Sequence, residues 1–359
     1  MSTFPLPSTR TRRLQRGLAI GLLSGLLVHC GLSYHPTPPA VVSGLAGKSV
    51  SDIAVSGVPG SLGVVVLIAG EGVSSFSGTA TSEAPMPMPF DAAQVQSLAG
   101  GSCVLYRDGS ANCLGMYRPM QIATDVAQIV TLVASGGAVY CVLGRSGSVR
   151  CGPEPLEGQS FTAVALDTGS QPVSQIAGSY DTLCGVTAPD AVRCWTLEGG
   201  TGKVQGPPVD VRGLTGLSQL AVYDHTACAV LGDGRVQCWQ TDPSTTSCGD
   251  LTTTPRVMEG LADVVEVALG DCRGCARKRD GGVLCWGQSG LFADRPNMFG
   301  EPPAPLVGLP AAKKLLLGNV NVGEDCLLST GGQVYCWGAF TTSGDNGGGC
   351  GPVFFIPSR

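Results

Sequence analysis

The sequence is poor in charge, in aromatic side chains and in histidine. Charged residues make up 14% of its 359 residues, aromatic residues make up 6%, and there are three histidines. The body of the chain also lacks runs of helical periodicity bounded by capping residues, and it has no basic tail. These absences exclude a helical bundle and leave few groups for acid-base catalysis or for a basic nucleic-acid surface.

Glycine and cysteine, by contrast, are abundant. The 53 glycines are about twice the usual share, and there are 16 cysteines. Many glycines suit a chain that turns often between short strands, and a chain of this length can bury a large core. The composition therefore favours an all-β fold.

One stretch, from Cys228 to Trp239, shows how such a strand pair is built. Its centre, Gly232-Asp233-Gly234, has the composition of a hairpin loop in which a type I turn is followed by a glycine with positive φ. Counting outward from the loop places Cys228 opposite Cys238, within reach of a disulfide. The spacing predicts a disulfide-linked hairpin.

This cysteine spacing is repeated along the chain, and every tryptophan directly follows a second cysteine of a pair. The other pairs are Cys103/Cys113, Cys141/Cys151, Cys184/Cys194, Cys275/Cys285 and Cys326/Cys336. A seventh, cysteine-free copy has Val66 and Phe76 in the cysteine positions. Seven copies of one hairpin predict a repeat architecture.

Each hairpin follows an apolar strand that ends in small residues, and a Pro- or Gly-marked segment precedes that strand. The apolar strands contain Ile53-Ala54, Leu98-Ala99, Val133-Ala134, Ile176-Ala177, Leu220-Ala221, Val267-Ala268 and Leu316-Leu317. Four strands in a unit of roughly 40 residues are typical of a propeller blade. We therefore predict an all-β, seven-bladed β-propeller over residues 41–359.

The repeated pattern, an apolar-small-Gly segment and then Cys-x-Leu-x-x-Asp-Gly-x-Val-x-Cys-Trp-Gly, resembles the repeat of the regulator-of-chromosome-condensation (RCC1) propellers. More narrowly, it is similar to the cysteine-rich version found in exported bacterial proteins. Leu114 and Gly152 stand where tryptophan is expected, and the family's histidine three places before the first cysteine is present only as His225.

Residues 1–30 have the pattern of an export signal, with four arginines followed by an apolar run over 17–28 that is short for a membrane span. Cys30 resembles the lipidated cysteine of a bacterial lipobox, although His29 stands where a small residue is usual. Ordinary signal cleavage is the alternative. Residues 31–40 then form a tether to the propeller.

Removal of residues 1–30 leaves 18 basic against 27 acidic residues, a net charge of −9. This charge argues against nucleic-acid binding and separates the chain from the chromatin-bound members of the family. Exported chains with this many cysteines form disulfides.

Four cysteines remain outside the hairpins, namely Cys30, Cys248, Cys272 and Cys350. A disulfide between Cys248 and Cys272 would close the loop between two hairpins, and it leaves Cys350 unpaired if Cys30 is lipidated. Zinc binding by Cys272 and Cys275 is the weaker alternative because further ligands are missing. We expect no metal and no cofactor.

No set of residues indicates catalysis, so we expect a protein that is not an enzyme. His225 is interpreted as a structural loop contact because a general base would need partners that the sequence does not show. The segment Asp345–Gly349 is interpreted as a terminal loop, because it lacks the further carboxylate of a calcium loop and the lysine of a phosphate loop.

The resemblance implies a binding scaffold. Exported relatives include an inhibitor of β-lactamases that grips its target through one propeller face, so we expect a monomeric propeller, held by lipid at the cell-envelope membrane or secreted, that binds a protein through its face loops. The alternatives are a regulator that exchanges guanine nucleotides on a small GTPase and a secreted enzyme inhibitor.

The two ends of the chain each carry a spare apolar segment. We assign 39–42 as the opening strand of the first blade and expect Val353–Ile356 to pair against that blade, because a free apolar strand would leave an exposed edge. In the alternative, the segment at 40–42 closes the ring and the tail packs loosely.

Overall fold

The computed structural model describes most of the chain from residue 40 to residue 338. The described residues are 40–41, 45, 47–55, 64–68, 72–76, 95–99, 103–114, 119–134, 137–155, 159–188, 190–242, 251–270, 272–287, 302–317 and 324–338. They contain strands and turns and no α-helix. None of these residues belongs to a helix long and apolar enough to cross a membrane.

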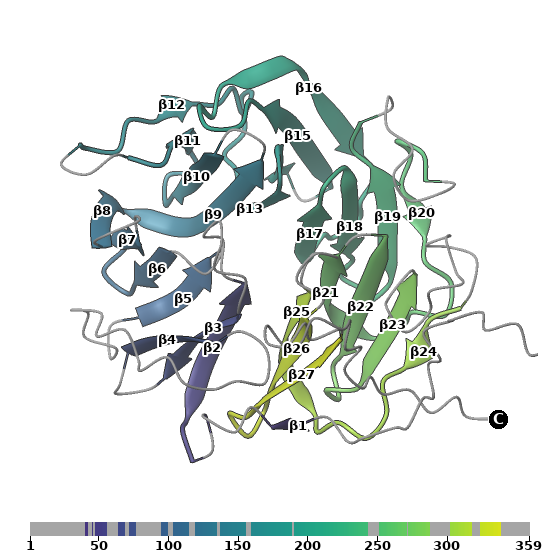
Figure 1. Ribbon diagram of the computed structural model, residues 1–359. Coiled ribbons are helices and arrows are strands. Elements are labelled where there is room, and N and C mark those ends of the chain that lie inside the picture. The colour runs from purple at the N-terminus through teal and green to yellow at the C-terminus, as the bar shows by residue number, and fades with distance from the viewer. Residues whose placement is uncertain are drawn as a thin grey trace, which may run out of the picture. The chain divides into compact units, whose positions relative to one another are not determined.

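Seven antiparallel sheets follow one another around a common centre within residues 34–359 (Figure 1). Each sheet starts at the centre with the apolar strand that the sequence predicts. The innermost strands are β2 (Val50–Val55), β5 (Val95–Ala99), β9 (Val126–Ala134), β13 (Gln175–Ser179), β17 (Gln219–Tyr223), β21 (Val264–Gly270) and β25 (Ala312–Leu317). Each contacts the next, and β2 also contacts β25, so the innermost strands form a closed ring.

The two strands of the predicted hairpin lie next outward in every sheet. The first strands of the hairpins are β3 (Val64–Ile68), β6 (Cys103–Tyr106), β10 (Gly137–Gly144), β14 (Thr182–Ala188), β18 (Thr226–Val230), β22 (Arg273–Lys278) and β26 (Glu324–Ser329). The second strands are β4 (Gly72–Phe76), β7 (Ala111–Leu114), β11 (Val149–Pro153), β15 (Ala191–Leu197), β19 (Val236–Gln240), β23 (Val283–Gly287) and β27 (Val334–Gly338).

In the second to sixth blades the outer strand comes from the next part of the chain, whereas the first blade consists of three strands in the described residues. The outer strands are β8 (Pro119–Ala123), β12 (Val164–Ala165), β16 (Val204–Arg212), β20 (Arg256–Val257) and β24 (Ala304–Pro305). In the last blade this place is taken by β1 (Ala40–Val41), which pairs with β27. The assignment of 39–42 to the first blade is therefore wrong: the start of the chain completes the last blade. The predicted pairing of Val353–Ile356 lies outside the described residues.

The hairpin register is the predicted one in all six cysteine-containing copies. Cys228 lies opposite Cys238, and Gly234, with φ of 80°, donates its N–H to the Leu231 carbonyl to close the turn. The structure joins all six pairs as disulfides, at Cys103–Cys113, Cys141–Cys151, Cys184–Cys194, Cys228–Cys238, Cys275–Cys285 and Cys326–Cys336. All twelve cysteines are buried in the apolar layers.

One predicted register is wrong. In the first hairpin Val66 lies opposite Ser74, while Phe76 lies opposite Val64, because the turn is centred one residue earlier than predicted. In the third blade the apolar strand β9 ends at Val133-Ala134 as predicted, and it is long enough that Cys141 lies opposite Val130. The first hairpin has no cysteines, so it lacks the signal that fixes the register of the other six.

The turn glycines also connect neighbouring blades. The Gly234 carbonyl accepts a hydrogen bond from Val264 at the start of the next innermost strand, at 3.0 Å. The same bond runs from Val126 to Gly109, from Val173 to Gly147, from Ala312 to Gly281 and from Val50 to Gly332. The last of these joins the seventh blade to the first and closes the ring.

A second set of bonds between blades runs around the centre. The Gln219 side chain bonds both the N–H and the carbonyl of Val267 in the next blade, at 3.0 and 3.2 Å, and Gln128 does the same with Ile176. At the equivalent position of the seventh blade, Lys314 donates to Asp52 of the first at 2.6 Å. We call this set the inner belt.

Candidate functional site

The propeller has two faces, which differ in the kind of turn that each blade places there. We define the hairpin face by the turns that contain Gly109, Gly147, Gly234, Gly281 and Gly332. The inner-turn face is the opposite one, where the innermost strand turns into the hairpin, as at Tyr180-Asp181 and Asp224-His225. Strands β19 and β23 also end at this face.

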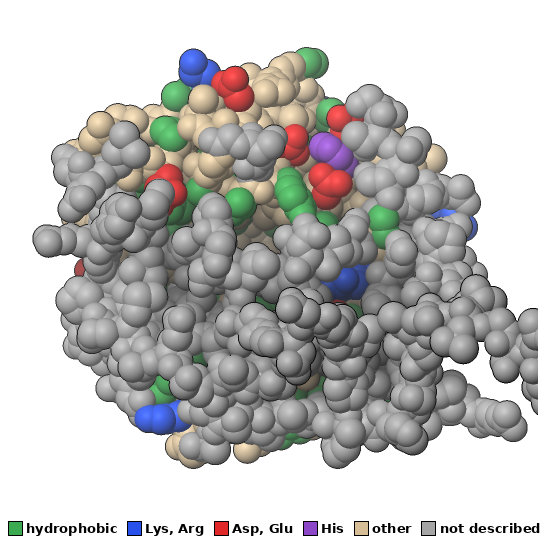
Figure 2. Space-filling view, in the orientation of Figure 1, with side chains coloured by type: hydrophobic (Ala, Val, Ile, Leu, Met, Phe, Trp, Pro, Cys, Tyr) green, Lys and Arg blue, Asp and Glu red, His purple; other side chains and the backbone are tan. Residues whose placement is uncertain are grey.

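The inner-turn face carries a cluster of ionisable side chains from two adjacent blades. Metal-ligating atoms of Asp181, Asp224 and His225 all lie within 4.8 Å of one another, and all three residues are half-buried. Figure 2 looks onto this face and shows a histidine side chain next to acidic side chains. We call these three residues the inner-turn cluster.

Local backbone geometry and packing hold the cluster in place. The turns are tight enough that Tyr180 and Asp224 adopt positive φ, at 54° and 51°. Each turn is tied to its own blade, because the carbonyl of Asp181 accepts the N–H of Leu197 at 2.6 Å and that of His225 accepts the N–H of Thr241 at 2.7 Å. The side chains are therefore presented by rigid turns.

A pair of tyrosines joins the two turns beside the cluster. The rings of Tyr180 and Tyr223 meet edge to face with their centroids 5.5 Å apart, and their hydroxyl oxygens are 3.3 Å apart. An aromatic pair of this kind contributes about 0.5–1.5 kcal/mol beyond the area it buries. Tyr223 is buried and Tyr180 is half-buried, so this contact packs the turns of two adjacent blades together beside the cluster.

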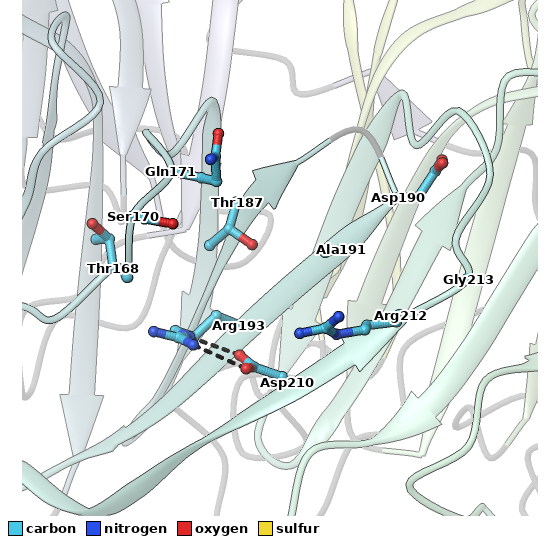
Figure 3. A pocket seen from close by; sticks show the side chains of 11 residues that line it. Thr168, Ser170, Gln171, Thr187, Asp190, Ala191, Arg193, Asp210, Arg212 and Gly213 are labelled. Carbon is cyan, nitrogen blue, oxygen red and sulfur yellow. Dashed lines mark hydrogen bonds and ion pairs between the residues drawn. The ribbon is translucent and has the colours of Figure 1, made fainter.

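A polar pocket of about 460 Å³ opens at the hairpin end of the fourth blade (Figure 3). Arg193 donates two hydrogen bonds to Asp210, at 2.7 and 2.9 Å, and this contact lowers the pKa of the Asp210 carboxyl and raises that of the guanidinium. Arg212 also faces this pair, and Thr168 and Ser170 line the opposite side.

A second hollow, of about 350 Å³, lies among inner-belt residues at the hairpin end of the centre. Four of its charged side chains form two pairs, Lys314 with Asp52 and Arg277 with Glu266, each at 2.6 Å, and Lys313 donates to the Ser51 carbonyl at 3.1 Å. These pairs connect strands of the fold, so the hollow is part of the structural belt.

The remaining predicted site residues have mixed outcomes. His225 makes the predicted loop contact, with its Nδ1 3.3 Å from the hydroxyl of Thr182 in the neighbouring blade. Cys272 is disulfide-bonded. Its predicted partner Cys248 lies outside the described residues, as do Cys30, Cys350 and Asp345–Gly349, so the Cys248–Cys272 pairing remains a proposal.

The sequence reading missed the inner-turn cluster. Asp181 occupies the position of His225 in the preceding repeat, three residues before the first cysteine of its hairpin. Because adjacent blades present equivalent turns side by side, two ionisable residues at this repeat position signal a contact between them. Within a single repeat, neither residue has a neighbour that indicates this contact.

Comparison with solved structures supports the fold at low sequence identity. Prp20p of Saccharomyces cerevisiae, described with its binding properties to Gsp1p and histones, is 16% identical with a TM-score of 0.57 over 85% of this chain and 86% of its own. Human WBSCR16 is 14% identical with a TM-score of 0.56 over 82% and 88%. Yeast RCC1 (Prp20) bound to Kap60 is 14% identical with a TM-score of 0.56 over 94% and 86%.

No protein-family model matches the chain, and no curated protein matches it either. The closed ring of seven sheets defines a seven-bladed β-propeller. Its structural neighbours and its hairpin repeat show that the propeller has the RCC1-type fold. The structural likeness, at 14 to 16% sequence identity, shows the fold and leaves the partner open.

Proposed function

We propose that this protein is an exported propeller scaffold that binds a protein partner through its inner-turn face. The observation that carries the proposal is the contrast between the two faces. The hairpin turns repeat one short geometry, whereas the opposite face carries the inner-turn cluster and the Tyr180–Tyr223 contact, which join two adjacent blades. Binding residues occur preferentially on loops held by a rigid scaffold.

Structural neighbours support a binding role without identifying the partner. Prp20p is described with binding to Gsp1p and histones, and with bound Kap60. This chain has 27 acidic residues against 22 basic ones, so it lacks the basic charge that nucleic-acid binding requires. We therefore propose a protein partner and no nucleic acid, and a function without catalysis.

The six hairpin disulfides support an exported location. Disulfides of this number persist in oxidising compartments and are rare in the cytosol, where a nucleotide-exchange factor would meet its GTPase. We propose that Cys30 is the lipidated first residue of the mature chain. Mass spectrometry of the processed N-terminus tests this: an acylated Cys30 supports the anchor, and an unmodified or different terminus refutes it.

Site-specific crosslinking in cells tests the binding face. A photoreactive amino acid replaces Glu198, which is exposed between β15 and β16 at the inner-turn face, or Asp233, which is exposed in a hairpin turn. We expect a discrete crosslinked protein from position 198, competed by excess unmodified propeller, and none from position 233. A discrete product only from position 233 would contradict the proposal, and so would the absence of a product from either.

A further inference from the structure

The inner belt is built from one repeat position, the residue directly before the apolar centre of each innermost strand, such as Ile176 or Leu220. In three successive blades this residue is a glutamine: Gln128, Gln175 and Gln219. Gln128 and Gln219 bond both backbone groups of a residue in the next blade, and Gln175 accepts the N–H of Leu220 at 3.1 Å. An amide offers a donor and an acceptor without charge, so these junctions do not depend on ionisation.

In the sixth blade the belt position holds Glu266, which acts as a charged acceptor. Its Oε1 atom accepts the N–H of Leu315 in the seventh blade at 3.3 Å, and its Oε2 atom accepts the Nε–H of Arg277 at 2.6 Å. An ionised carboxylate accepts hydrogen bonds and donates none. The junction between the sixth and seventh blades therefore uses a negative charge where the preceding junctions use an amide.

The next two belt positions form an ion pair between the seventh and first blades. Lys314 donates to Asp52 Oδ1 at 2.6 Å, and the same oxygen accepts the N–H of Ile53 at 2.9 Å. Asp52 is 8% exposed and belongs to β2, so the pair lies where the first blade meets the last. Hydrogen bonds between charged groups are about twice as strong as neutral ones, so the ionised form of Asp52 stabilises this junction.

The charged belt residues share the hollow of about 350 Å³ at the centre of the hairpin face. Arg277, Lys313 and Lys314 line it together with Asp52 and Glu266, which leaves one positive charge in excess while both carboxylates are ionised. The other lining residues are uncharged, namely Ser51, Gln219, Val265 and Leu328. Carboxylates take up protons at about pH 4, whereas lysine and arginine stay charged. In acid, three positive charges therefore face one another without a counter-charge from these two carboxylates.

We propose that the ring has an acid-sensitive junction, formed by the seventh blade with its two neighbours. Protonation of Asp52 and Glu266 removes their attraction for Lys314 and Arg277 and leaves the three basic side chains to repel one another. The stabilisation is present while the carboxylates are ionised and is lost as the pH falls. The glutamine junctions do not change with pH, so β2 and β25 separate before β13 and β17 do.

Hydrogen exchange followed by mass spectrometry tests this in the folded wild type at pH 7 and at about pH 4. Each rate is divided by that of an unstructured peptide at the same pH, and the disulfides are reduced only after quenching. We expect acid to raise the corrected exchange rate in β2 and β25 at least about tenfold more than in β13 and β17. An equal rise in all blades, or no rise in β2 and β25, overturns the proposal.

Variants identify the groups that respond to acid. D52N/E266Q replaces both carboxylates by amides of similar shape and should abolish the selective rise, whereas E259Q, at an exposed turn outside the belt, should retain it. Q219E places a carboxylate at a glutamine junction and should extend the rise to β17 and β21, which gives a second test if the double variant does not fold. A selective rise that persists in D52N/E266Q, is lost in E259Q or does not spread in Q219E contradicts the proposal. The measurement uses no partner, so its outcome is separate from that of the proposed protein binding.

Discussion

Asp108, Asp233 and Asp280 occupy the same position in three hairpin turns and make the same bond. Each carboxylate accepts the backbone N–H two residues further on, at 2.8 Å from Ser110, 3.0 Å from Arg235 and 2.9 Å from Gly282. Hydrogen bonds from these residues lower the pKa of all three carboxyls. An aspartate in this position therefore stabilises the turn through its ionised form.

Substitution of Asp233 tests this at the level of one residue. D233A should lower the urea midpoint at neutral pH, and D233N, which keeps a side-chain acceptor for the Arg235 N–H, should lower it less. Because the folded-state pKa is depressed, the stabilisation is present above the unfolded value of about 3.9 and is lost as the pH falls through the folded value. The difference between wild type and D233A should therefore shrink in acid to about the difference between D233N and D233A; a difference that does not shrink there would contradict the ionic part of the effect.

The role of a single residue can be predicted from the sequence when that role depends only on its neighbours in the chain. Asp233 and Gly234 are readable as turn residues because the chemistry of the loop is local. The second role of Gly234, as acceptor for Val264 of the next blade, depends on which blade lies beside it and has no local signal. The same applies to Asp181 and His225, whose contact exists only across a blade interface.

At the scale of the strand, the inner belt is the feature that joins one blade to the next. Gln219 replaces the sheet hydrogen bonds that β17 and β21 cannot make, because the two strands belong to separate sheets. A side chain that satisfies both groups of Val267 links two apolar layers without leaving unpaired backbone groups.

Q219L should remove this link while keeping a side chain of similar size. Two hydrogen bonds with a net contribution of about 0.5–1.5 kcal/mol each give an expected loss of about 1–3 kcal/mol in the free energy of unfolding. Urea denaturation measures it. The control is Q171L, at an exposed position outside the belt, which should change stability by less than about 0.5 kcal/mol. Equal effects of the two variants would show that the belt does not stabilise the propeller.

The strands themselves were predictable because turn chemistry and cysteine spacing agree. In six hairpins both signals select the same register, and the structure has that register. In the first hairpin neither cysteines nor an Asp-Gly turn is present, and apolar residues such as Val64 and Val66 allow more than one alignment. Alternation alone cannot choose between registers that differ by two residues, because the same side chains then face the core.

At the scale of the whole molecule, the ring depends on strand β1. It occupies the outer edge of the last blade through the pairs Ala40–Cys336 and Val41–Tyr335, while β2 begins the first blade. One chain end thus takes part in two neighbouring blades and holds them together. The sequence indicated that a terminal strand closes the ring, but not which one, because apolar segments occur at both ends.

Truncation distinguishes the two ends. A chain that begins at residue 43 should melt at a clearly lower temperature than one that begins at residue 38, because it lacks β1 and exposes the edge of β27. Circular dichroism during heating measures both. A chain without residues 352–359 completes the comparison. If its melting temperature falls further than that of the chain that begins at residue 43, the C-terminal segment contributes more to closing the ring than β1 does.

The place of β1 also sets the order in which the molecule can be finished. Ala40 and Val41 leave the ribosome before any blade, yet their pairing partners, Tyr335 and Cys336, are among the last blade residues to be made. The first six blades can therefore form before β1 has a pairing partner. A nascent chain that stops before residue 335 lacks the β27 residues with which β1 pairs. The ring can therefore close only after the last hairpin has been synthesised.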